Sequence, residues 1–388
     1  MTALHVVQPG DGGVARVVTD MVGAQLAQGL RVAVACPPGT PLAAAVRARG
    51  AEVHPWRAGR DPGLRLVAES RRVAEIVALV RPDLVHAHSA KAGLAARVAV
   101  RGRVPTVYQP HAWSFEAVGG AMAALARGWE RWAAARWTDR VVCVSEAERR
   151  RGEDAGVRAA WSVIHNGVDV GRFTAGPAEA RGTPEARGQA PGRARGQVPG
   201  PAGPLVVCVG RLCRQKGQDV LLRAWPEVVA RVPGARLVLV GDGPSAAGLR
   251  ASAPASVRFA GAVDDTAPWY RAADLVVLPS RWEGMALAPL EAMASGRPVL
   301  ITDVDGAREC LPPGHEAHCL VPPDDPAALT EALTRLLRRP VLRRILGRRA
   351  HQHVLDRFDV RRAGAALADV YREVAAPRHR ETREPIPQ

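Results

Sequence analysis

The sequence predicts an α/β protein made of two Rossmann-like domains, each a doubly wound parallel sheet, that face each other across a central cleft. Its 388 residues exceed what one ordinary hydrophobic core accommodates, so two cores are expected. Hydrophobic residues make up 47% of the chain and aromatic residues only 4%, which leaves Ala, Val and Leu to fill those cores. This composition is typical of buried parallel strands covered by helices, and short apolar runs do alternate with helical stretches.

The first domain is expected over residues 1–173. Seven apolar runs of strand length occur there, separated by Ala- and Arg-rich segments of helical period. In order along the chain they are LHVVQP, RVAVACP, AEVHPW, DLVHAHS, TVYQPHA, DRVVCVS and SVIHNG. A repeated succession of strand, helix and strand indicates parallel pairing within one sheet.

The pattern stops over residues 174–204, where Gly, Pro, Ala and Arg dominate and a flexible linker is expected. It restarts in a second domain, expected over residues 205–375. The strand runs of that domain are LVVCVGR, ARLVLVGDG, SVRFAGA, LVVLPS, PVLITDV and HCLVPP. The last helical stretch is interrupted at Pro340 and Asp359, and the polar residues 376–388 are expected to form a disordered tail.

A basic loop follows the first strand of the second domain. Arg211 and Lys216 lie in RLCRQKGQDVLLRAW, between the carboxyl end of that strand and the start of a helix. Open α/β sheets bind ligands at this end, and cations beside a helix N-terminus suit a diphosphate. We interpret the loop as a phosphate site, although the loop taken alone could be a solvated basic segment.

Two glutamates eight positions apart follow another strand of the second domain. Glu283 and Glu291 occur in SRWEGMALAPLEAMASGRPVL. If a helix begins near Gly284, Glu283 lies at its mouth, where free backbone N–H groups can hold an anion or sugar hydroxyls. Glu291 would follow about two turns along the same helix, where its carboxylate could accept paired hydrogen bonds from a ribose diol.

With these features the chain resembles the retaining glycosyltransferases of family 4, which have the GT-B fold. The Glu-x7-Glu signature of that family matches Glu283 and Glu291, and its basic phosphate loop matches GRLCRQKG. In the first half the resemblance rests on GDGGVAR, DLVHAHSAKAG, YQPHAW, VVCVSEAER and IHNGVDVGRF, so that it covers nearly the whole chain.

The resemblance implies a reaction and a set of site residues. A sugar would pass from a nucleoside-diphosphate sugar to an acceptor hydroxyl with retention of anomeric configuration, and a sugar or lipid-linked precursor of a polysaccharide would be the acceptor. The first domain would lie on the acceptor side and the second would hold the donor. The implied residues are His111 and Glu283 for catalysis, Gly12, Gly13, Arg211 and Lys216 for the donor diphosphate, and Gly284, Met285, Ala286, Leu287 and Glu291 for the donor sugar and nucleotide.

Some of these positions depart from the common family pattern. Gly-Met-Ala-Leu follows Glu283 where a Gly-Phe-Gly-Leu type of sequence is common, and Asp305 stands where a glycine pair is usual. Ala112 follows His111 in place of the commoner glycine. Gly12 and Gly13 keep their place after the first strand, where backbone without side chains would approach the donor phosphates or would simply turn.

No metal or other cofactor is expected. Cys310, His315, His318 and Cys319 offer four soft ligands within ten residues. His318 and Cys319, however, open the strand-like run HCLVPP, where neighbouring side chains point to opposite faces. We therefore expect no zinc site in this segment.

A second acidic pair also suggests a metal site. Asp303 and Asp305 resemble the Asp-x-Asp motif of the other main glycosyltransferase fold, but that fold has no second repeat of strands. The resemblance to family 4 implies instead that Arg211, Lys216 and helix N-termini neutralise the leaving diphosphate.

Other activities were weighed against this interpretation. GDGPSA at Gly241 satisfies the dinucleotide fingerprint with Asp264 near the required distance, but it follows the second strand of its domain rather than the first. A nucleotide-sugar epimerase would share the two-domain architecture and need no acceptor. A basic nucleic-acid-binding protein is the alternative that is not an enzyme, yet no recognition helix stands out, so nucleic acid is not an expected partner.

The formal net charge of +15 favours an anionic partner, although a compositional bias toward Arg would also produce it. The stretch ALARGWERWAAARW interleaves Trp129, Trp132 and Trp137 with Arg127, Arg131 and Arg136. It predicts either a surface helix for lipid headgroups or a packed helix with extended arginines. No apolar run is long enough to span a bilayer and no leader precedes the first strand, so we expect a cytoplasmic protein with peripheral contact to an anionic membrane.

His86 and His88 lie two positions apart at the end of DLVHAHS. Residues two apart on a strand share one face, so both could face the cleft. The alternative, which we favour, is that they pack or hydrogen-bond within the sheet.

Overall fold

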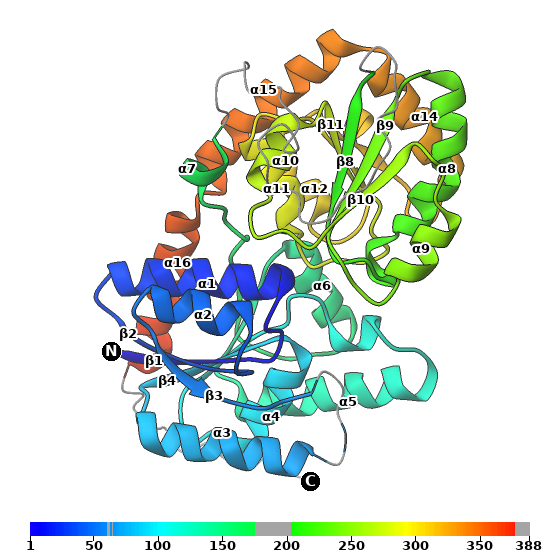
Figure 1. Ribbon diagram of the computed structural model, residues 1–388. Helices are drawn as coiled ribbons and strands as arrows, with labels where there is room; N and C mark the ends of the chain where they lie inside the picture. Colours follow the sequence, from blue (N-terminus) through cyan, green and yellow to red (C-terminus); the bar gives the residue numbers. More distant parts are fainter. Residues whose placement is uncertain (60–62, 64, 175–202, 377–388) are drawn as a thin grey trace.

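The structure, a computed structural model, describes residues 1–59, 63, 65–174 and 203–376, which fold into two α/β domains (Figure 1). Apart from residues 174, 203, 204 and 376, the expected linker and tail lie outside the described residues.

The first sheet has seven strands in the described chain, in the order β3-β2-β1-β4-β5-β6-β7, and all its pairings are parallel. The strands are β1 (Thr2–Val7), β2 (Arg31–Cys36), β3 (Glu52–Pro55), β4 (Leu84–His88), β5 (Thr106–Gln109), β6 (Arg140–Cys143) and β7 (Trp161–Val163). Each overlaps one of the seven apolar runs, and β1 and β7 begin before theirs, at Thr2 and Trp161. The order turns from one direction to the other between β1 and β4, the kind of position at which open sheets bind ligands.

Helices cover both faces of this sheet (Figure 1). They are α1 (Gly12–Ala27), α2 (Pro41–Ala48), α3 (Leu66–Val80), α4 (Ser89–Val100), α5 (Gly120–Trp137) and α6 (Glu146–Asp154), with a 3-10 turn η1 (Ser114–Glu116) before α5. The short helix α7 (Val170–Phe173) follows and packs on the second domain through Phe173. The strands β1, β2 and β4 are buried along nearly their whole length by Val, Ala and Leu side chains, as the composition predicts.

The second sheet repeats the plan with six described strands in the order β10-β9-β8-β11-β12-β13, again all parallel. The strands are β8 (Leu205–Val209), β9 (Arg236–Val240), β10 (Val257–Gly261), β11 (Leu275–Leu278), β12 (Val299–Thr302) and β13 (Leu320–Val321). Its helices are α8 (Gln218–Arg231), α9 (Ala246–Ser252), α10 (Ala267–Ala272), α11 (Leu287–Ala294), α12 (Ala307–Cys310), α13 (Glu316–Cys319), α14 (Pro326–Leu337) and α15 (Pro340–Arg357), with a 3-10 turn η3 (Arg214–Lys216) before α8.

The final helix, α16 (Val360–Ala375), packs on the first domain, which differs from the expected second domain of residues 205–375. In Figure 1 it descends from α15 to lie beside α1. Its buried face covers the first sheet, with Leu367, Val370, Tyr371 and Val374 packed on Ala3, Leu84, Val107 and Val142. The spacing of those four helix residues places them on one side, so the helix follows the apolar surface that it can bury.

Two chain segments connect the domains and lie side by side. The N–H of Val168 donates to the carbonyl of Phe358 at 2.8 Å, and the N–H of Val360 donates to the carbonyl of Val168 at 3.0 Å. A Cβ on Gly167 would lie 2.6 Å from the Cα of Val360, so only glycine allows the segments to approach this closely.

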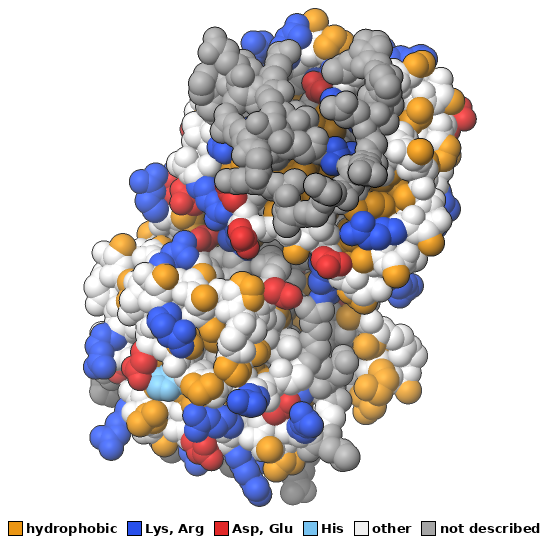
Figure 2. Space-filling model, viewed as in Figure 1, with side chains coloured by type: hydrophobic (Ala, Val, Ile, Leu, Met, Phe, Trp, Pro, Cys, Tyr) orange, Lys and Arg blue, Asp and Glu red, His pale blue; other side chains and the backbone are white. Residues whose placement is uncertain are grey.

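The surface in Figure 2 carries Lys and Arg side chains scattered over both domains among acidic and apolar ones, rather than gathered in one basic face. Within the described residues, none of the helices combines the length and apolar character that a bilayer span requires.

Candidate functional site

The expected phosphate loop joins β8 to α8 at the carboxyl end of the second sheet. Gly217 ends η3 with φ +64, and a Cβ there would lie 2.0 Å from the carbonyl oxygen of Pro279. Glycine is therefore required for the loop to pack on the segment after β11. This packing brings Lys216 to Glu283, whose Oε1 lies 2.5 Å from the Lys216 Nζ.

Arg211 lies at the start of the same loop and contacts the GDG segment after β9. A Cβ on Gly243 would lie 3.0 Å from Cγ of Arg211 and 2.4 Å from the carbonyl oxygen of Leu212. A Cβ on Gly241 would lie 2.1 Å from the carbonyl oxygen of Gly210. Both glycines have positive φ, +137 and +158 for Gly241 and Gly243. The motif that resembled a dinucleotide fingerprint thus serves close packing against the phosphate loop.

Arg281 fastens this loop from the segment after β11. Its guanidinium pairs with Asp219 through two nitrogens, at 2.8 and 2.7 Å, and with Asp324 at 2.7 Å. It also donates to the carbonyl of Arg214 at 2.8 Å. Hydrogen bonds from Arg281 lower the pKa of Asp219, so this group is ionised and the pair holds the loop at neutral pH.

Glu283 is buried beside the loop and also accepts a hydrogen bond from the Ser280 hydroxyl at 2.6 Å. The helix expected near Gly284 begins only at Leu287, so Glu291 lies little more than one turn into α11 rather than two. The carbonyl of Gly284 accepts from the Ser145 hydroxyl at 2.9 Å, and that of Met285 accepts from Asn166 Nδ2 at 2.7 Å. These bonds to the first domain hold residues 284–286 outside the helix.

Gly284 is one of the points where the two domains meet. A Cβ there would lie 2.9 Å from Val144 Cγ2, 3.0 Å from Glu148 Oε1 and 3.1 Å from the backbone carbon of His111. The absence of a side chain therefore lets the donor-side segment reach the His111 loop. Met285 and Leu287 are buried behind it, while Ala286 precedes α11 and is partly exposed.

Glu291 is buried and faces both domains. The Tyr270 hydroxyl donates to its Oε2 at 2.8 Å, and Arg16 of α1 places Nη1 3.7 Å from its Oε1. Burial raises the pKa of Glu291, while the Arg16 charge opposes that rise. A ribose in this position would therefore meet a carboxylate that already bridges the domains.

His111 and Ala112 occupy a strained loop after β5. Their φ angles are +59 and +121, which cost about 1 to 3 kcal/mol for each residue that is not glycine. The carboxylate of Glu148 accepts hydrogen bonds from the N–H of Ala112 at 2.6 Å and of Val144 at 2.7 Å. Burial raises the pKa of Glu148 to about 8, against the effect of these two donors. Glu148 thus holds the strained loop in place.

Gly12 and Gly13 begin α1, near Arg16. Gly12 has φ +76, and a Cβ on either glycine would have no atom within 4 Å among the described residues. The start of this helix therefore presents open backbone at the carboxyl end of β1.

The segments weighed as metal sites have other partners. Asp305 pairs with Arg151 through two hydrogen bonds of 2.7 Å, and Asp303 pairs with Arg308. Cys319 ends the short helix α13 and does not open a strand, contrary to the sequence expectation. Among the described residues, Cys310, His315, His318 and Cys319 do not bring three ligating atoms together, whereas His5, His86 and His88 do, within 4.8 Å.

Sequence reasoning missed several residues of this site. Arg16, Ser145, Glu148 and Asn166 all lie in segments that carry the family resemblance, GDGGVAR, VVCVSEAER and IHNGVDVGRF. Their presence in those motifs was the available signal. Their partners, however, lie on distant elements, so a motif alone does not assign them a role.

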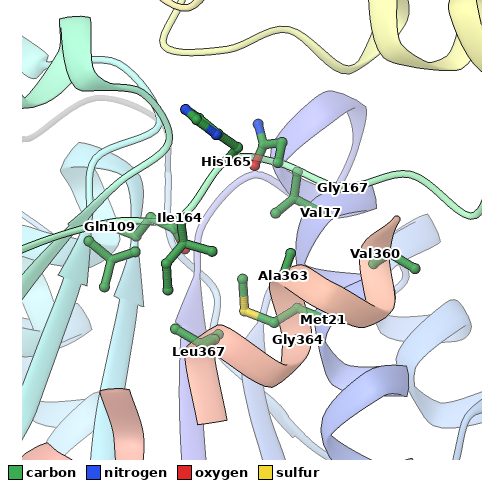
Figure 3. Close-up of a pocket in the computed structure, with 12 residues that line it drawn as sticks. Val17, Met21, Gln109, Ile164, His165, Gly167, Val360, Ala363, Gly364 and Leu367 are labelled. Atoms are coloured by element: carbon green, nitrogen blue, oxygen red, sulfur yellow. The ribbon is translucent and has the colours of Figure 1, made fainter. Parts of the chain in front are cut away.

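Two hollows adjoin these residues. One, of about 250 Å³, is lined by Ser280, Glu283, Ala286 and Gly306 on the donor side. The other, of about 380 Å³, lies between α1, α16 and the connecting segment that carries His165 and Gly167 (Figure 3). In Figure 3 mainly apolar side chains from α1 and α16 line it.

Comparisons with known proteins agree with this geometry. The family described as Glycosyltransferase Family 4 matches residues 11–172, and that described as Glycosyl transferases group 1 matches residues 203–339. A D-inositol 3-phosphate glycosyltransferase of Streptomyces bingchenggensis is 33% identical over 373 residues, which cover 87% of this chain and 78% of the relative. The Escherichia coli UDP-Gal:alpha-D-GlcNAc-diphosphoundecaprenol alpha-1,3-galactosyltransferase is 27% identical and covers 74% and 75%.

A solved structure supports the fold. HepE from Anabaena, in complex with UDP-glucose, superposes with a TM-score of 0.81 at 22% identity, covering 96% of this chain and 100% of HepE. Two parallel-sheet domains with this likeness constitute the GT-B fold. Taken with the family matches over both halves, the fold and the relatives show that the chain is a glycosyltransferase and belongs to glycosyltransferase family 4.

Proposed function

We propose that this glycosyltransferase transfers a sugar from a nucleoside-diphosphate sugar to an acceptor hydroxyl with retention of anomeric configuration and without a required metal. One observation carries the proposal: the basic loop delivers Lys216 to Glu283 at 2.5 Å, beside the Gly284 contact with the His111 loop. A cation for the leaving group and a carboxylate for the sugar thus lie together where the domains meet. The likeness to HepE, which was solved with UDP-glucose, supports a nucleotide-sugar donor.

The proposed donor diphosphate lies against Arg211, Lys216 and the open backbone of Gly12 and Gly13. Negative charge grows on this diphosphate as the glycosidic bond breaks. Fixed cations and backbone N–H groups that face this charge stabilise the transition state without reorganising, which is the role that a metal fulfils in other enzymes. When the donor binds, the Lys216 ammonium would turn from Glu283 toward the diphosphate and share its charge between the two.

The remaining roles concern the sugar and the nucleoside. Glu283 would lie near the reacting face, where its charge favours an oxocarbenium-like transition state attacked from the side that the leaving group vacates. His111 would contact the sugar and the acceptor from the first domain, and residues 284–287 would line the donor. Glu291 would accept hydrogen bonds from the ribose hydroxyls.

We further propose a lipid-linked or cell-surface polysaccharide precursor as acceptor, with peripheral contact to an anionic membrane. The Escherichia coli relative, by its name, acts on a diphosphoundecaprenol-linked sugar. On α5, Met122, Leu125, Trp129 and Trp132 follow at intervals of three and four and so form one stripe, here called the α5 stripe. Met122 is 55% and Leu125 67% exposed. In Figure 2 apolar side chains gather on the lobe where Figure 1 draws α5.

A panel of nucleoside-diphosphate sugars tests the proposal. The donor that raises the melting temperature most should be the substrate, because a ligand that binds the native state stabilises it by mass action. Incubation of that donor with lipid-linked acceptors, in buffer with EDTA, should then yield a product whose anomeric configuration by NMR matches the donor. Inverted product, activity that requires a metal, or conversion of the donor alone, as by an epimerase, would each contradict the proposal.

A further inference from the structure

Three histidines lie on one face of the first sheet beneath the cleft. β1 and β4 are neighbours, and His5 stands directly opposite His86 in the parallel register. His88 follows two positions after His86 and therefore shares its face. All three side chains are fully buried. Because strand positions alternate between faces, this grouping follows from the register alone.

The histidines join a continuous chain of hydrogen bonds that ends at the candidate site. Gln25 Oε1 lies 2.8 Å from His5 Nε2, and His5 Nδ1 lies 2.9 Å from His88 Nε2. His88 Nδ1 in turn lies 3.1 Å from His111 Nε2. His5 and His88 use both ring nitrogens in this chain, whereas His111 uses Nε2 and leaves Nδ1 without a hydrogen bond to the described protein. His86 stands beside the chain and bonds through Nδ1 alone, to the Tyr371 hydroxyl.

These imidazoles are neutral. Burial lowers the pKa of His5 to about 4 and that of His111 to about 3. Burial, together with the neighbouring histidines, holds the pKa of His88 well below its ordinary value. A neutral imidazole carries one N–H, so it donates through one nitrogen and accepts through the other. In a chain of such rings, the tautomer of one ring fixes the tautomer of the next.

The buried end of the chain sets its direction. Gln25 Nε2 donates to the Tyr371 hydroxyl at 3.2 Å, and this hydroxyl lies 2.5 Å from His86 Nδ1. When the Tyr371 hydroxyl donates its proton to His86 Nδ1, it accepts from Gln25 Nε2, and the Gln25 oxygen faces His5. His5 then donates from Nε2 and accepts at Nδ1. His88 then donates from Nε2 to His5 and accepts at Nδ1. His111 consequently donates from Nε2 and keeps a lone pair on Nδ1.

We propose that Gln25, His5 and His88 are positioning residues that hold His111 in the tautomer protonated at Nε2, so that its Nδ1 accepts a hydrogen bond from a sugar hydroxyl at the cleft. Tyr371 of α16 determines the direction by fixing the amide of Gln25. This inference rests on the proposed role of His111, and it links the last helix of the chain to the site through side chains alone.

A metal is the competing explanation for the cluster, because His5, His86 and His88 bring ligating nitrogens within 4.8 Å of one another. Three neutral rings would leave a divalent charge uncompensated in a fully buried place, since no carboxylate or thiolate of the described residues joins the group. The nitrogens of His5 and His88 already hydrogen-bond to each other, and the chain of bonds accounts for both. The hydrogen-bonded network is therefore the explanation that we adopt.

The test reads the tautomers directly by NMR of the full chain labelled with 15N-histidine. In the parent protein we expect His111, His88 and His5 each to show a protonated Nε2 and an unprotonated Nδ1. Tyr371→Phe keeps the ring in the core but removes the hydroxyl that orients Gln25, and Gln25→Met removes the anchor. Both should convert the His111 signal to the other tautomer or to a mixture of the two.

Kinetics with the donor found by the thermal screen give the second measurement. Gln25→Met and Tyr371→Phe should lower kcat roughly tenfold with little change in the donor KM, because the network acts on the reacting groups and not on the nucleotide. His54→Gln is the matched control, since His54 is a buried histidine of β3 that pairs with Glu52 at 2.9 Å. It should change neither the His111 tautomer nor kcat.

Several results would overturn the inference. They are an Nδ1-protonated His111 in the parent, an unchanged His111 tautomer in both variants, parent-like kcat in both variants, or a stoichiometric metal in the purified protein measured by mass spectrometry. If the parent transfers no sugar from any donor, the proposed function fails, while the NMR measurement still decides whether the network holds His111 as described.

Discussion

Lys216 and Glu283 are paired at 2.5 Å, and the proposed function assigns them to different parts of the substrate. Lys216 is a compact charge on a flexible stem, so it can turn from the carboxylate to a diphosphate without moving the backbone. Glu283 keeps its hydrogen bond from Ser280 when it does so.

The donor contacts should separate kinetically. Lys216→Ala and Arg211→Ala remove cations from a leaving group whose charge grows in the transition state, so kcat should fall by the equivalent of about 2.7 to 4 kcal/mol for each. Glu291→Ala should chiefly raise the donor KM, because ribose contacts are equal before and during the reaction. Steady-state kinetics measure both effects. Arg223→Ala, an exposed cation of α8 paired with Asp219, is the control. Parent kinetics in all three variants would mean that the donor site is misplaced.

Ala112 holds a backbone conformation that favours glycine, the commoner residue at this position of the family. Its φ of +121 is strained for a residue with a Cβ, and the Glu148 carboxylate holds its N–H. The chain therefore stores strain beside His111.

Ala112→Gly should relieve this strain. We expect the free energy of unfolding to rise by about 1 kcal/mol, since the relief of about 1 to 3 kcal/mol exceeds the entropy that glycine adds to the unfolded chain. Urea denaturation measures the change. Ala117→Gly, at an exposed position of the same loop with φ −80, should destabilise slightly. Equal effects of the two substitutions would argue that Ala112 is unstrained.

At the scale of elements, the pairing of β1 with β4 concentrates buried imidazoles. Each must stay neutral in the folded protein, whereas in the unfolded chain it takes up a proton near pH 6.5. Folding therefore competes with protonation.

Stability should consequently fall on acidification. Above pH 6.5 both the folded and the unfolded chain keep the histidine neutral, so the free energy of unfolding is unaffected. As the pH falls below 6.5, the unfolded chain takes up a proton that the folded protein does not. The free energy of unfolding then falls until the pH reaches the folded pKa, which is about 4 for His5. For His5 alone this amounts to roughly 3 kcal/mol. Urea denaturation between pH 7 and pH 4 measures it. His5→Gln should flatten the decline, while His318→Gln, outside the cluster, should not. An equally steep decline in His5→Gln would contradict this account.

The α5 stripe is an element-scale feature because it arises from helical spacing. Two basic residues of α5 are held by backbone carbonyls through one nitrogen each: Arg131 Nε donates to the carbonyl of Ala155, and Arg127 Nε donates to that of Ala123 at 3.2 Å. Trp129 and Trp132 lie with ring centroids 5.7 Å apart. Arg127, Arg131 and Arg136 are all exposed, so the outward face of α5 carries both apolar and basic side chains.

Vesicles should reveal whether this stripe binds lipid. We expect sedimentation with anionic liposomes at low salt and release as salt rises, because screening acts over roughly 8 to 10 Å near physiological ionic strength. Leu125→Glu should reduce the bound fraction several-fold. Val341→Glu, which changes an exposed valine of α15 in the second domain, is the control. Equal binding to neutral vesicles would contradict an electrostatic component, and parent-like binding of Leu125→Glu would exclude the stripe.

At the scale of the whole molecule, hydrogen bonds between the domains hold them together. Glu309 of α12 accepts from the N–H groups of Glu146 at 2.8 Å and Ala147 at 2.9 Å, so a carboxylate of the second domain caps α6 of the first. His165 Nε2 lies 2.9 Å from the same carboxylate. Burial opposes the charge, but these hydrogen bonds lower the pKa of Glu309 overall. The cap is thus ionised and effective at neutral pH.

Removing this cap should loosen the domain contact. Glu309→Ala leaves two N–H groups at a helix N-terminus without their acceptor, a loss of about 1 to 2 kcal/mol. We expect a larger radius of gyration by small-angle X-ray scattering in the absence of donor. Glu331→Ala, which breaks a pair with Arg231 within the second domain, is the control. An unchanged radius in Glu309→Ala would show that other contacts, such as the pair Arg16 and Glu291, suffice.

Much of the architecture could be predicted from local pattern. Every described strand overlaps an apolar run, and the last helices break at Pro340 and Asp359 as expected, because Pro lacks an N–H and Asp caps the next helix. The loop after β8 and the spacing of Glu283 and Glu291 are readable from the sequence because strand ends and short motifs encode backbone geometry within a few residues, while their roles in donor binding stay predictions. The sequence by itself thus determined the two sheets and the positions of the site segments.

Only the tertiary structure decided how those segments meet. The return of α16 to the first sheet, the start of α11 at Leu287 and the chain of bonds from Tyr371 to His111 depend on partners far apart in sequence; Gln25 and Tyr371 are separated by 346 in residue number. Hydrophobic period reports which face of an element is buried, but not which surface buries it. That choice is made by the packing of both domains together, and it decides which carboxylates, cations and imidazoles become neighbours.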